Sequence, residues 1–197
     1  MRIYNLHEDD FAAVIALGNK INGANYLDEH VCEKILQGSI KNGLNCSYVA
    51  YAIERGDEEA SAFRLTYAPG QWDIDTWFCP DKWKVPQDKV CLFKSNMVDE
   101  AYRGQGLGPL LLKHSMETTK QQGAVAGITH IWMQSPNNSA YKYFTKAGGE
   151  VVVIHPDRWH NDFSDFGYVC TICGEDCHCD GAEMILYFDK AFPINIR

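Results

Sequence analysis

Two stretches of the chain concentrate residues whose types and spacing could do chemistry. The first, RGQGLG at residues 103–108, places three glycines on alternate positions just before a leucine-rich run. The second, CTICGEDCHCDG, holds Cys170, Cys173, Cys177 and Cys179 within ten residues. Free backbone N–H groups at the start of a helix bind anions, and grouped thiolates bind metal ions. We therefore consider an anion site at the first stretch and a metal site at the second.

The glycine-rich stretch predicts a phosphate cradle at the start of a helix. Gly104, Gly106 and Gly108 leave room for a ligand, and Pro109 suits a first helical turn, where its missing N–H would have no partner. A tight turn that merely needs glycine is the alternative. A P-loop would need Lys and Ser or Thr after the last glycine, and a Rossmann fingerprint would need its third glycine at position 109. The flanking residues therefore exclude both nucleotide motifs.

The cysteine cluster has the right ligands for zinc but an unusual spacing. Four thiolates can hold a tetrahedral zinc ion, and the Cys-x2-Cys half is typical of such sites. Only three residues separate the two cysteine pairs, so free thiols, adventitious metal capture and a local disulfide remain alternatives. Nearby His155, His160 and His178 are alternative ligands. We place the cluster in an insertion, residues 157–182, and expect it to clip a loop. The other cysteines are expected to be reduced and buried: Cys32, Cys46, Cys79 and Cys91.

Apolar periodicity and turn residues predict the elements that position these stretches. Strands are expected at 2–6, 46–54, 60–68, 89–98, 129–135, 150–155 and 182–188, and helices at 11–21, 27–40, 137–148 and from the glycine-rich stretch to about Gln122. The second and third strands form a hairpin. Between them and the next strand, residues 69–88 are too aromatic for a free linker, so we expect a packed excursion over a binding face.

Composition bounds the class of protein. A chain of 197 residues with 46% hydrophobic residues suits one domain, residues 1–197. The formal net charge of −8, without a basic run, argues against a nucleic-acid partner. No segment has the apolar length that spans a bilayer, and the N-terminus does not resemble an export signal. We expect a cytoplasmic protein.

Two motifs together resemble the GNAT superfamily of acyl-CoA N-acyltransferases. Residues 103–108 match that family's Arg/Gln-x-x-Gly-x-Gly/Ala motif, and NNSAYKYFTKAGG at 137–149 resembles its Asn-x-x-Ala-x-x-x-Tyr-x-Lys-x-Gly-Phe helix. The order of elements from Arg2 to about Phe188 is also similar. The resemblance implies an α+β GNAT fold: a mixed, mostly antiparallel twisted sheet flanked by helices, here with a Cys-rich insertion before the last strand.

The resemblance also implies a ligand, acetyl-CoA or another acyl-CoA. Its pyrophosphate would lie on the backbone amides of residues 103–108, and its pantetheine would pair with the strand that ends at Val98, between two splayed strands. The residues expected to contact it are Val98, Arg103, Gly104, Gln105, Gly106, Leu107, Gly108, Asn137, Asn138 and Lys146.

The catalytic groups depart from the family's pattern. Many members use a Glu or Asp near the middle of the fourth strand to accept the amine's proton, but residues 90–98 contain no carboxylate. Asp73, Asp75, Asp99 and Glu100 are the possible substitutes. A lysine amine has a pKa of about 10.4, so a proton must leave before it can attack a thioester.

The proton donor to the leaving thiolate is also missing. The family's usual Tyr is Phe144 here, which cannot donate a proton. Tyr141 lies one helical turn earlier on the same face, and Tyr143 is adjacent, so these two are the candidate catalytic residues. Packing with a solvated hydroxyl is the alternative for both, and positioning alone could then suffice.

These observations predict an N-acetyltransferase that transfers an acetyl group from acetyl-CoA to an amine of a small molecule or peptide by direct attack. The alternative is a catalytically weak acyl-CoA sensor or docking domain of the same fold. The acceptor would be selected by the first two helices and residues 69–88. An acyl-CoA and an amine are the expected partners, structural zinc is considered, and a homodimer is left open.

Overall fold

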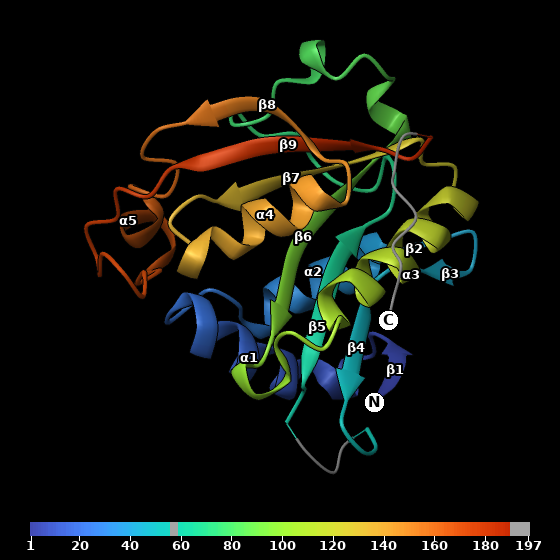
Figure 1. The fold of residues 1–197 in the computed structure, drawn as a ribbon, viewed down its shortest axis with the longest axis horizontal. Helices are drawn as coiled ribbons and strands as arrows, with labels where there is room; N and C mark the ends of the chain where they lie inside the picture. The colour runs from blue at the N-terminus through green and yellow to red at the C-terminus, as the bar shows by residue number, and fades with distance from the viewer. Residues whose placement is uncertain (56–58, 190–197) are drawn as a thin grey trace.

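A twisted seven-stranded sheet runs through the molecule in the order β1-β4-β5-β6-β7-β9-β8 (Figure 1). The computed structural model describes residues 1–55 and 59–189. Neighbouring strands are antiparallel except β6 and β7, which are parallel, so the predicted mixed, mostly antiparallel sheet is confirmed. The strands are β1 (Arg2–Asn5), β4 (Tyr48–Tyr51), β5 (Ala62–Tyr67), β6 (Val90–Val98), β7 (Ala126–Trp132), β8 (Glu150–His155) and β9 (Gly181–Tyr187).

Helices cover both faces of this sheet. One face packs against α1 and α2, and their apolar side chains share a core cluster with β5 and β6. The other face packs against α3 and α4, where a second cluster is centred on Phe93 and Phe144. The helices are α1 (Phe11–Asn22), α2 (Glu29–Ser39), α3 (Leu107–Gln121), α4 (Ser139–Lys146) and α5 (Asp162–Phe166). Short 3₁₀ turns precede α1, β6, α3 and α4: η1 (Glu8–Asp10), η2 (Pro80–Lys82), η3 (Gln87–Lys89), η4 (Glu100–Tyr102) and η5 (Pro136–Asn138).

The strand predicted at 129–135 is displaced, since β7 spans Ala126–Trp132, and three short elements were not predicted. A small hairpin, β2 (Ile40–Lys41) and β3 (Leu44–Asn45), follows α2 and was not predicted. Its turn is Asn42-Gly43, with φ of 54° and 75°, so the Asn-Gly dipeptide was the signal that could have found it. Helix α5 lies inside the Cys-rich insertion and was also not predicted. The hairpin of β4 and β5 is confirmed, and part of its predicted turn lies outside the described residues.

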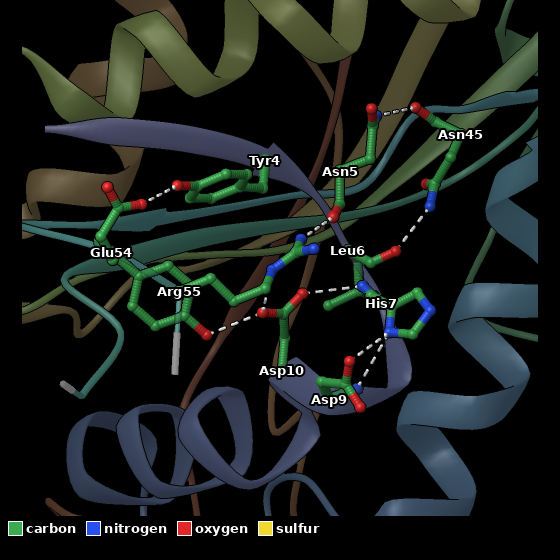
Figure 2. Close-up of polar contacts among 10 residues, drawn as sticks. Tyr4, Asn5, Leu6, His7, Asp9, Asp10, Asn45, Glu54 and Arg55 are labelled. Atoms are coloured by element: carbon green, nitrogen blue, oxygen red, sulfur yellow. Dashed lines mark hydrogen bonds and ion pairs between the residues drawn. The ribbon is translucent and has the colours of Figure 1, made fainter. Parts of the chain in front are cut away.

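A buried carboxylate holds the N-terminal strand to the first helix (Figure 2). Asp10 is fully buried; it accepts hydrogen bonds from the Tyr51 hydroxyl and the His7 backbone N–H, both at 2.8 Å. Its charge pairs with the Arg55 Nε at 3.0 Å, and the Arg55 guanidinium lies 4.6 Å from the Tyr4 ring centre. Because buried charges are costly unless paired, this network fixes α1 against β1 and β4.

The aromatic segment 69–88 is packed, as predicted. Trp72 and Phe78 have ring centres 5.1 Å apart, and both contact Trp83, whose side chain is fully buried. The Tyr187 hydroxyl donates a hydrogen bond to the Trp83 carbonyl over 2.8 Å, which ties the segment to β9. We call residues 69–88 the aromatic loop; it covers the half of the sheet formed by β7, β9 and β8.

Candidate functional site

The strands β6 and β7 separate in the middle of the sheet (Figure 1). They pair only from Val90 to Leu92 on β6 and from Ala126 to Ile128 on β7. On its other side β6 has a bulge, because Thr66 pairs with Phe93 and Leu65 pairs with Ser95. Lys94 is the extra residue, and a bulge of this kind bends the strand. Beyond Leu92, β6 therefore has no strand partner on the β7 side within the described part of the chain.

The glycine-rich loop lies where β6 ends. Gly104 and Gly106 have φ of 77° and 82°, which L side chains rarely adopt, and a Cβ at either position would meet nothing within 4 Å. Helix α3 starts at Leu107 with Gly106 as a cap that supplies no side-chain acceptor. Within the described residues, the N–H groups of residues 104–108 have no hydrogen-bond partner. The loop thus presents open backbone donors at the positive end of a helix.

Side chains at the loop's edge tie it back to the protein. The Asp99 carboxylate caps the short turn before the loop and pairs with Lys20 Nζ at 2.8 Å. The hydrogen bond from Lys20 lowers the pKa of Asp99. Arg103 Nε donates to the Val98 carbonyl at 3.2 Å, and Gln105 Nε2 bonds to the carbonyl of residue 101. Because these side chains bond back to the protein, the outward surface of the loop is formed by its backbone.

Helix α4 supports the start of α3 through Tyr143. The Tyr143 hydroxyl donates to the Gly108 carbonyl at 3.2 Å and accepts from Arg64 Nη1 at 3.2 Å. Arg64 is 2% exposed and stacks on the Phe93 ring at 4.3 Å. Burial raises the pKa of Tyr143. The structure therefore places this candidate beside the loop, with its hydroxyl already bonded on both sides.

Tyr141 and Phe144 occupy different environments on the same helix. Tyr141 is partly buried against the Phe93 and Phe144 cluster, and its hydroxyl has no partner within the described residues. The Phe144 ring is 1% exposed and lies over Gly149, where a Cβ would approach to 2.3 Å. An apolar ring suits this position because a tyrosine hydroxyl buried there would need a partner.

The remaining predicted coenzyme contacts lie along α4 and at the end of β6. Asn137 and Asn138 both adopt left-handed backbone before α4, and the Asn138 Oδ1 is buried without a partner in the described chain. Lys146 is exposed in the last turn of α4, at the end away from these asparagines. Val98 packs near Leu107. The structure thus brings Val98, the glycine-rich loop and Tyr143 together, and it leaves Lys146 apart.

The separation of β6 from β7 leaves an opening in the sheet. On the face of the sheet covered by α1 and α2, charged and aromatic groups lie beside this opening. Desolvation, and then the charge of Arg158, lower the pKa of Lys94. Arg158 lies 4.7 Å from the Trp77 ring centre and 3.7 Å from an Asp75 oxygen. Of the four acids considered as bases, Asp75 is the one in this group. Asp73 is almost fully exposed beside Lys34 on α2.

His130 lies on β7 on the same face. Its Nε2 is 3.0 Å from the Trp77 carbonyl oxygen, so the bonded tautomer carries the proton there. Burial, followed by the charge of Arg158, lowers the pKa of His130 to about 3. This imidazole is therefore neutral at physiological pH.

The sequence reasoning missed several of these residues. Arg64 on β5 and Glu183 on β9 are buried charges that interrupt apolar strands, in the runs AFRLTY and AEMILY, and Lys94 interrupts the run CLFKSN on β6 but is exposed. A charge inside a strand that otherwise reads as core is a detectable signal, because such a group must be paired or functional when buried.

The four clustered cysteines come together in space. Their sulfur atoms all lie within 4.8 Å of one another, and the Sγ atoms of Cys173 and Cys179 are 3.5 Å apart. Cys170 and Gly174 exchange two backbone hydrogen bonds, and Gly174 has a φ of 75°. The Ile172 N–H points at the Cys170 sulfur at 3.5 Å. This tight turn brings the sulfur atoms together despite the short spacing.

The other cysteines and the nearby histidines lie elsewhere. His160 and His178 gather with Asp176 at the surface, and His155 lies with Cys79 and Glu183, so the histidines are separate from the four sulfur atoms. The prediction that Cys79 is buried is wrong, because it lies partly exposed in the aromatic loop. The three remaining thiols are free and buried, as predicted: Cys32, Cys46 and Cys91.

The Cys-rich insertion packs on the loop between α1 and α2. Val169 N–H donates to the Ala24 carbonyl at 3.1 Å, and the Tyr168 hydroxyl donates to the Asn22 carbonyl at 2.9 Å. A Cβ on Gly23 would lie 1.8 Å from the Val169 oxygen, so the two segments touch through backbone. The insertion therefore forms part of the wall on the α1 and α2 face.

Comparisons with known proteins agree with this geometry. Residues 75–149 match the sequence profile of the acetyltransferase (GNAT) family. No curated protein sequence matches the chain significantly.

Three solved structures are similar across nearly the whole chain. The ribosomal-protein-alanine N-acetyltransferase of Brucella melitensis has 15% identity over 95% of this chain and 100% of its own, with a TM-score of 0.64. Naa20 of Chaetomium thermophilum, in complex with a bisubstrate analogue, has 11% identity over 96% and 88%, with a TM-score of 0.66. YncA of Salmonella typhimurium, a putative acetyltransferase solved with acetyl-CoA, has 17% identity over 98% and 96%, with a TM-score of 0.60.

The fold is that of the GNAT acetyltransferases. The profile match and the structural neighbours confirm the resemblance to this superfamily and the predicted fold class, with the Cys cluster before the last strand. No helix in the described part of the chain is long and apolar enough to cross a membrane.

Proposed function

We propose that this protein is an N-acetyltransferase that transfers an acetyl group from acetyl-CoA to an amine of a small molecule or peptide. One observation carries the proposal: a loop whose N–H groups, residues 104–108, have no hydrogen-bond partner within the described residues adjoins the point where β6 separates from β7. The loop can hold a pyrophosphate, and the free edge of β6 can pair with the amides of pantetheine up to Val98.

The reaction we propose is direct attack. The amine nitrogen forms a bond with the thioester carbon, the carbon–sulfur bond breaks, and the thiolate of CoA leaves. The glycine-rich loop that would hold the coenzyme leads into α3, which packs on one face of the sheet, so the acceptor would enter from the opposite face, which carries Asp75 and His130. Holding both reactants in the opening supplies much of the catalysis, since orientation alone can lower a barrier by several kcal/mol.

The proton leaves the amine on the face that carries Asp75. This carboxylate accepts it through water, because the low pKa of His130, about 3, makes that imidazole a weak base and its Nε2 is bonded to the Trp77 carbonyl. Tyr141 is the proposed donor to the thiolate, since its hydroxyl has no protein partner in the described chain. Tyr143 is the second candidate, and its two hydrogen bonds suit a positioning residue better.

We also propose a structural zinc ion at Cys170, Cys173, Cys177 and Cys179. The proximity of the four sulfur atoms supports it, and the N–H that points at Cys170 suits a bound thiolate. Held by zinc, the insertion keeps its contacts with the loop between α1 and α2, and so keeps one wall of the acceptor side in place.

An acyl-CoA sensor is the second candidate function. The absence of a carboxylate from Val90–Val98 favours it, as does the buried ring of Phe144 at the family's tyrosine position. A cytoplasmic location and a homodimer remain predictions.

A thiol-release assay separates the two functions. Purified protein is given acetyl-CoA and a panel of amines that includes peptides with free N-termini, since one structural neighbour is named for a protein alanine. Release of CoA that depends on one class of amine supports the enzyme. Binding of acetyl-CoA without release for any amine supports the sensor.

The coenzyme site is tested by Gly106→Val, with Gly123→Val as its matched control. Both glycines have positive φ and open space around the Cβ position, but Gly123 lies after α3, away from the loop. We expect Gly106→Val to weaken acetyl-CoA binding more than about tenfold in calorimetry, because the side chain blocks the phosphate. Equal affinities for the two variants would reject the assignment.

A further inference from the structure

A second group of metal-ligating side chains lies under the aromatic loop. Cys79 comes from that loop, His155 from β8 and Glu183 from β9, and one ligand atom of each lies within 4.8 Å of the others. Three parts of the chain that are far apart in sequence therefore converge at one point. This group is separate from the four-cysteine cluster and from the glycine-rich loop.

The two oxygens of Glu183 differ in their hydrogen bonding. Its side chain is fully buried, and its Oε1 accepts hydrogen bonds from Trp83 Nε1 at 2.6 Å and from the Cys79 backbone N–H at 3.1 Å. Its Oε2 is buried and has no hydrogen-bond partner within the described residues. A buried carboxylate in this state is costly unless a cation balances it.

The Nε2 atom of His155 faces the Glu183 Oε2. This Nε2 is buried, has no hydrogen-bond partner in the described part of the chain and lies 3.6 Å from the Glu183 Oε2. That distance is too long for a hydrogen bond. Zinc binds nitrogen and oxygen at about 2.0–2.2 Å, so two such ligands on a tetrahedral ion lie roughly 3.4 Å apart. The observed separation is close to that value.

We propose that Cys79, His155 and Glu183 form a second site for a divalent transition ion, with zinc as the ion that this donor set suits best. A thiolate, a neutral imidazole and a carboxylate together carry two negative charges, which one dication neutralises. The Trp83 and Cys79 donors that hold Oε1 act as the outer hydrogen bonds that orient a ligating carboxylate. A fourth position is left for water, as in zinc sites with three protein ligands.

The proposed metal site adjoins residues on the acceptor side of the sheet. The His155 ring lies 5.5 Å from the Trp77 ring and 5.6 Å from the His130 ring, measured between centres. A metal bond to Cys79 would fasten the aromatic loop, which carries Trp77 and Asp75, to β8 and β9. This site does not depend on acetyl-CoA binding, so it stands or fails separately from the proposed function.

The test is metal content. Protein is saturated with zinc, freed of excess by gel filtration and analysed for zinc per chain. We expect Cys79→Ser and His155→Gln each to hold one equivalent fewer than the parent, and His30→Gln, a matched control at an exposed histidine on α2 outside the three possible metal groups of the described residues, to equal the parent. Cys173→Ser reports the four-cysteine site separately. Equal zinc in the parent, Cys79→Ser and His155→Gln would overturn the proposal.

Cobalt gives a second measurement that does not depend on stability. Cobalt bound to a thiolate shows charge-transfer absorption. In the Cys173→Ser background, Cys79→His should retain a cobalt ion at this site but lose the thiolate absorption that Cys79 contributes. Unchanged absorption would show that Cys79 is not a ligand.

Discussion

The hydroxyl of Tyr143 on α4 donates a hydrogen bond to the carbonyl oxygen of Gly108 in the first turn of α3. The same hydroxyl accepts from the buried guanidinium of Arg64 on β5. One side chain thus links the central sheet, the second motif helix and the glycine-rich loop. The loop can remain open to a ligand on its outer surface because it is supported from below.

Tyr143→Phe should therefore lower stability. It removes the hydrogen bonds from this hydroxyl to the Gly108 carbonyl and from Arg64 Nη1 to this hydroxyl, and a buried donor left unsatisfied costs about 1–3 kcal/mol. We expect a lower melting temperature and weaker acetyl-CoA binding, with turnover at saturating acetyl-CoA changed little. A variant that keeps its melting temperature and affinity but loses turnover would instead identify Tyr143 as the proton donor.

Tyr141→Phe should have the opposite signature. Its hydroxyl makes no hydrogen bond within the described residues, so removing it should leave stability and acetyl-CoA affinity near those of the parent. If it protonates the leaving thiolate, kcat should fall more than tenfold, since a positioned acid contributes about 10²–10⁴-fold. Equal kcat values would leave Tyr141 with a packing role only.

Removing the proposed zinc should loosen the Cys-rich insertion without emptying the coenzyme site. Cys173 is the exposed ligand, so Cys173→Ser should lower the bound zinc by one equivalent per chain and should disturb the packing little. Metal binding energy is available only to the folded arrangement, so the melting temperature should fall, as it should on chelation. Hydrogen exchange should increase in residues 157–180, while acetyl-CoA affinity is kept. Parent protein that carries no zinc at this site, prepared under reducing conditions, would reject it.

The Asp99 and Lys20 pair should contribute a pH dependence. Because the pKa of Asp99 is lowered in the folded protein, its contribution is present above the unfolded value of about 3.9 and is lost as pH falls through the folded value. Asp99→Asn can still cap the turn but has no charge. Its melting temperature should therefore fall less steeply than that of the parent below about pH 4. Lys20→Gln is the matched control and should behave alike. If the melting temperatures of all three proteins fall equally with pH, the Asp99 and Lys20 pair does not contribute to the pH dependence.

Local patterns in the sequence determined much of this protein. Alternating and helical apolar periods predict most strands and helices. Asp28, just before α2, accepts a hydrogen bond from the Val31 N–H as its cap, and Gly104 and Gly106 adopt the left-handed backbone that glycine tolerates best. These features depend on neighbours within a few residues, so a single sequence suffices to predict them.

Tertiary structure decided how distant residues combine. The separation of β6 from β7 depends on which strands pair, and the Lys94 bulge depends on the register with β5. Likewise, nothing local relates Cys79 to Glu183, more than one hundred positions later. A charge within an apolar strand signals that a partner must exist, but only the folded chain selects it, because the partner is set by packing between elements rather than by spacing along the sequence.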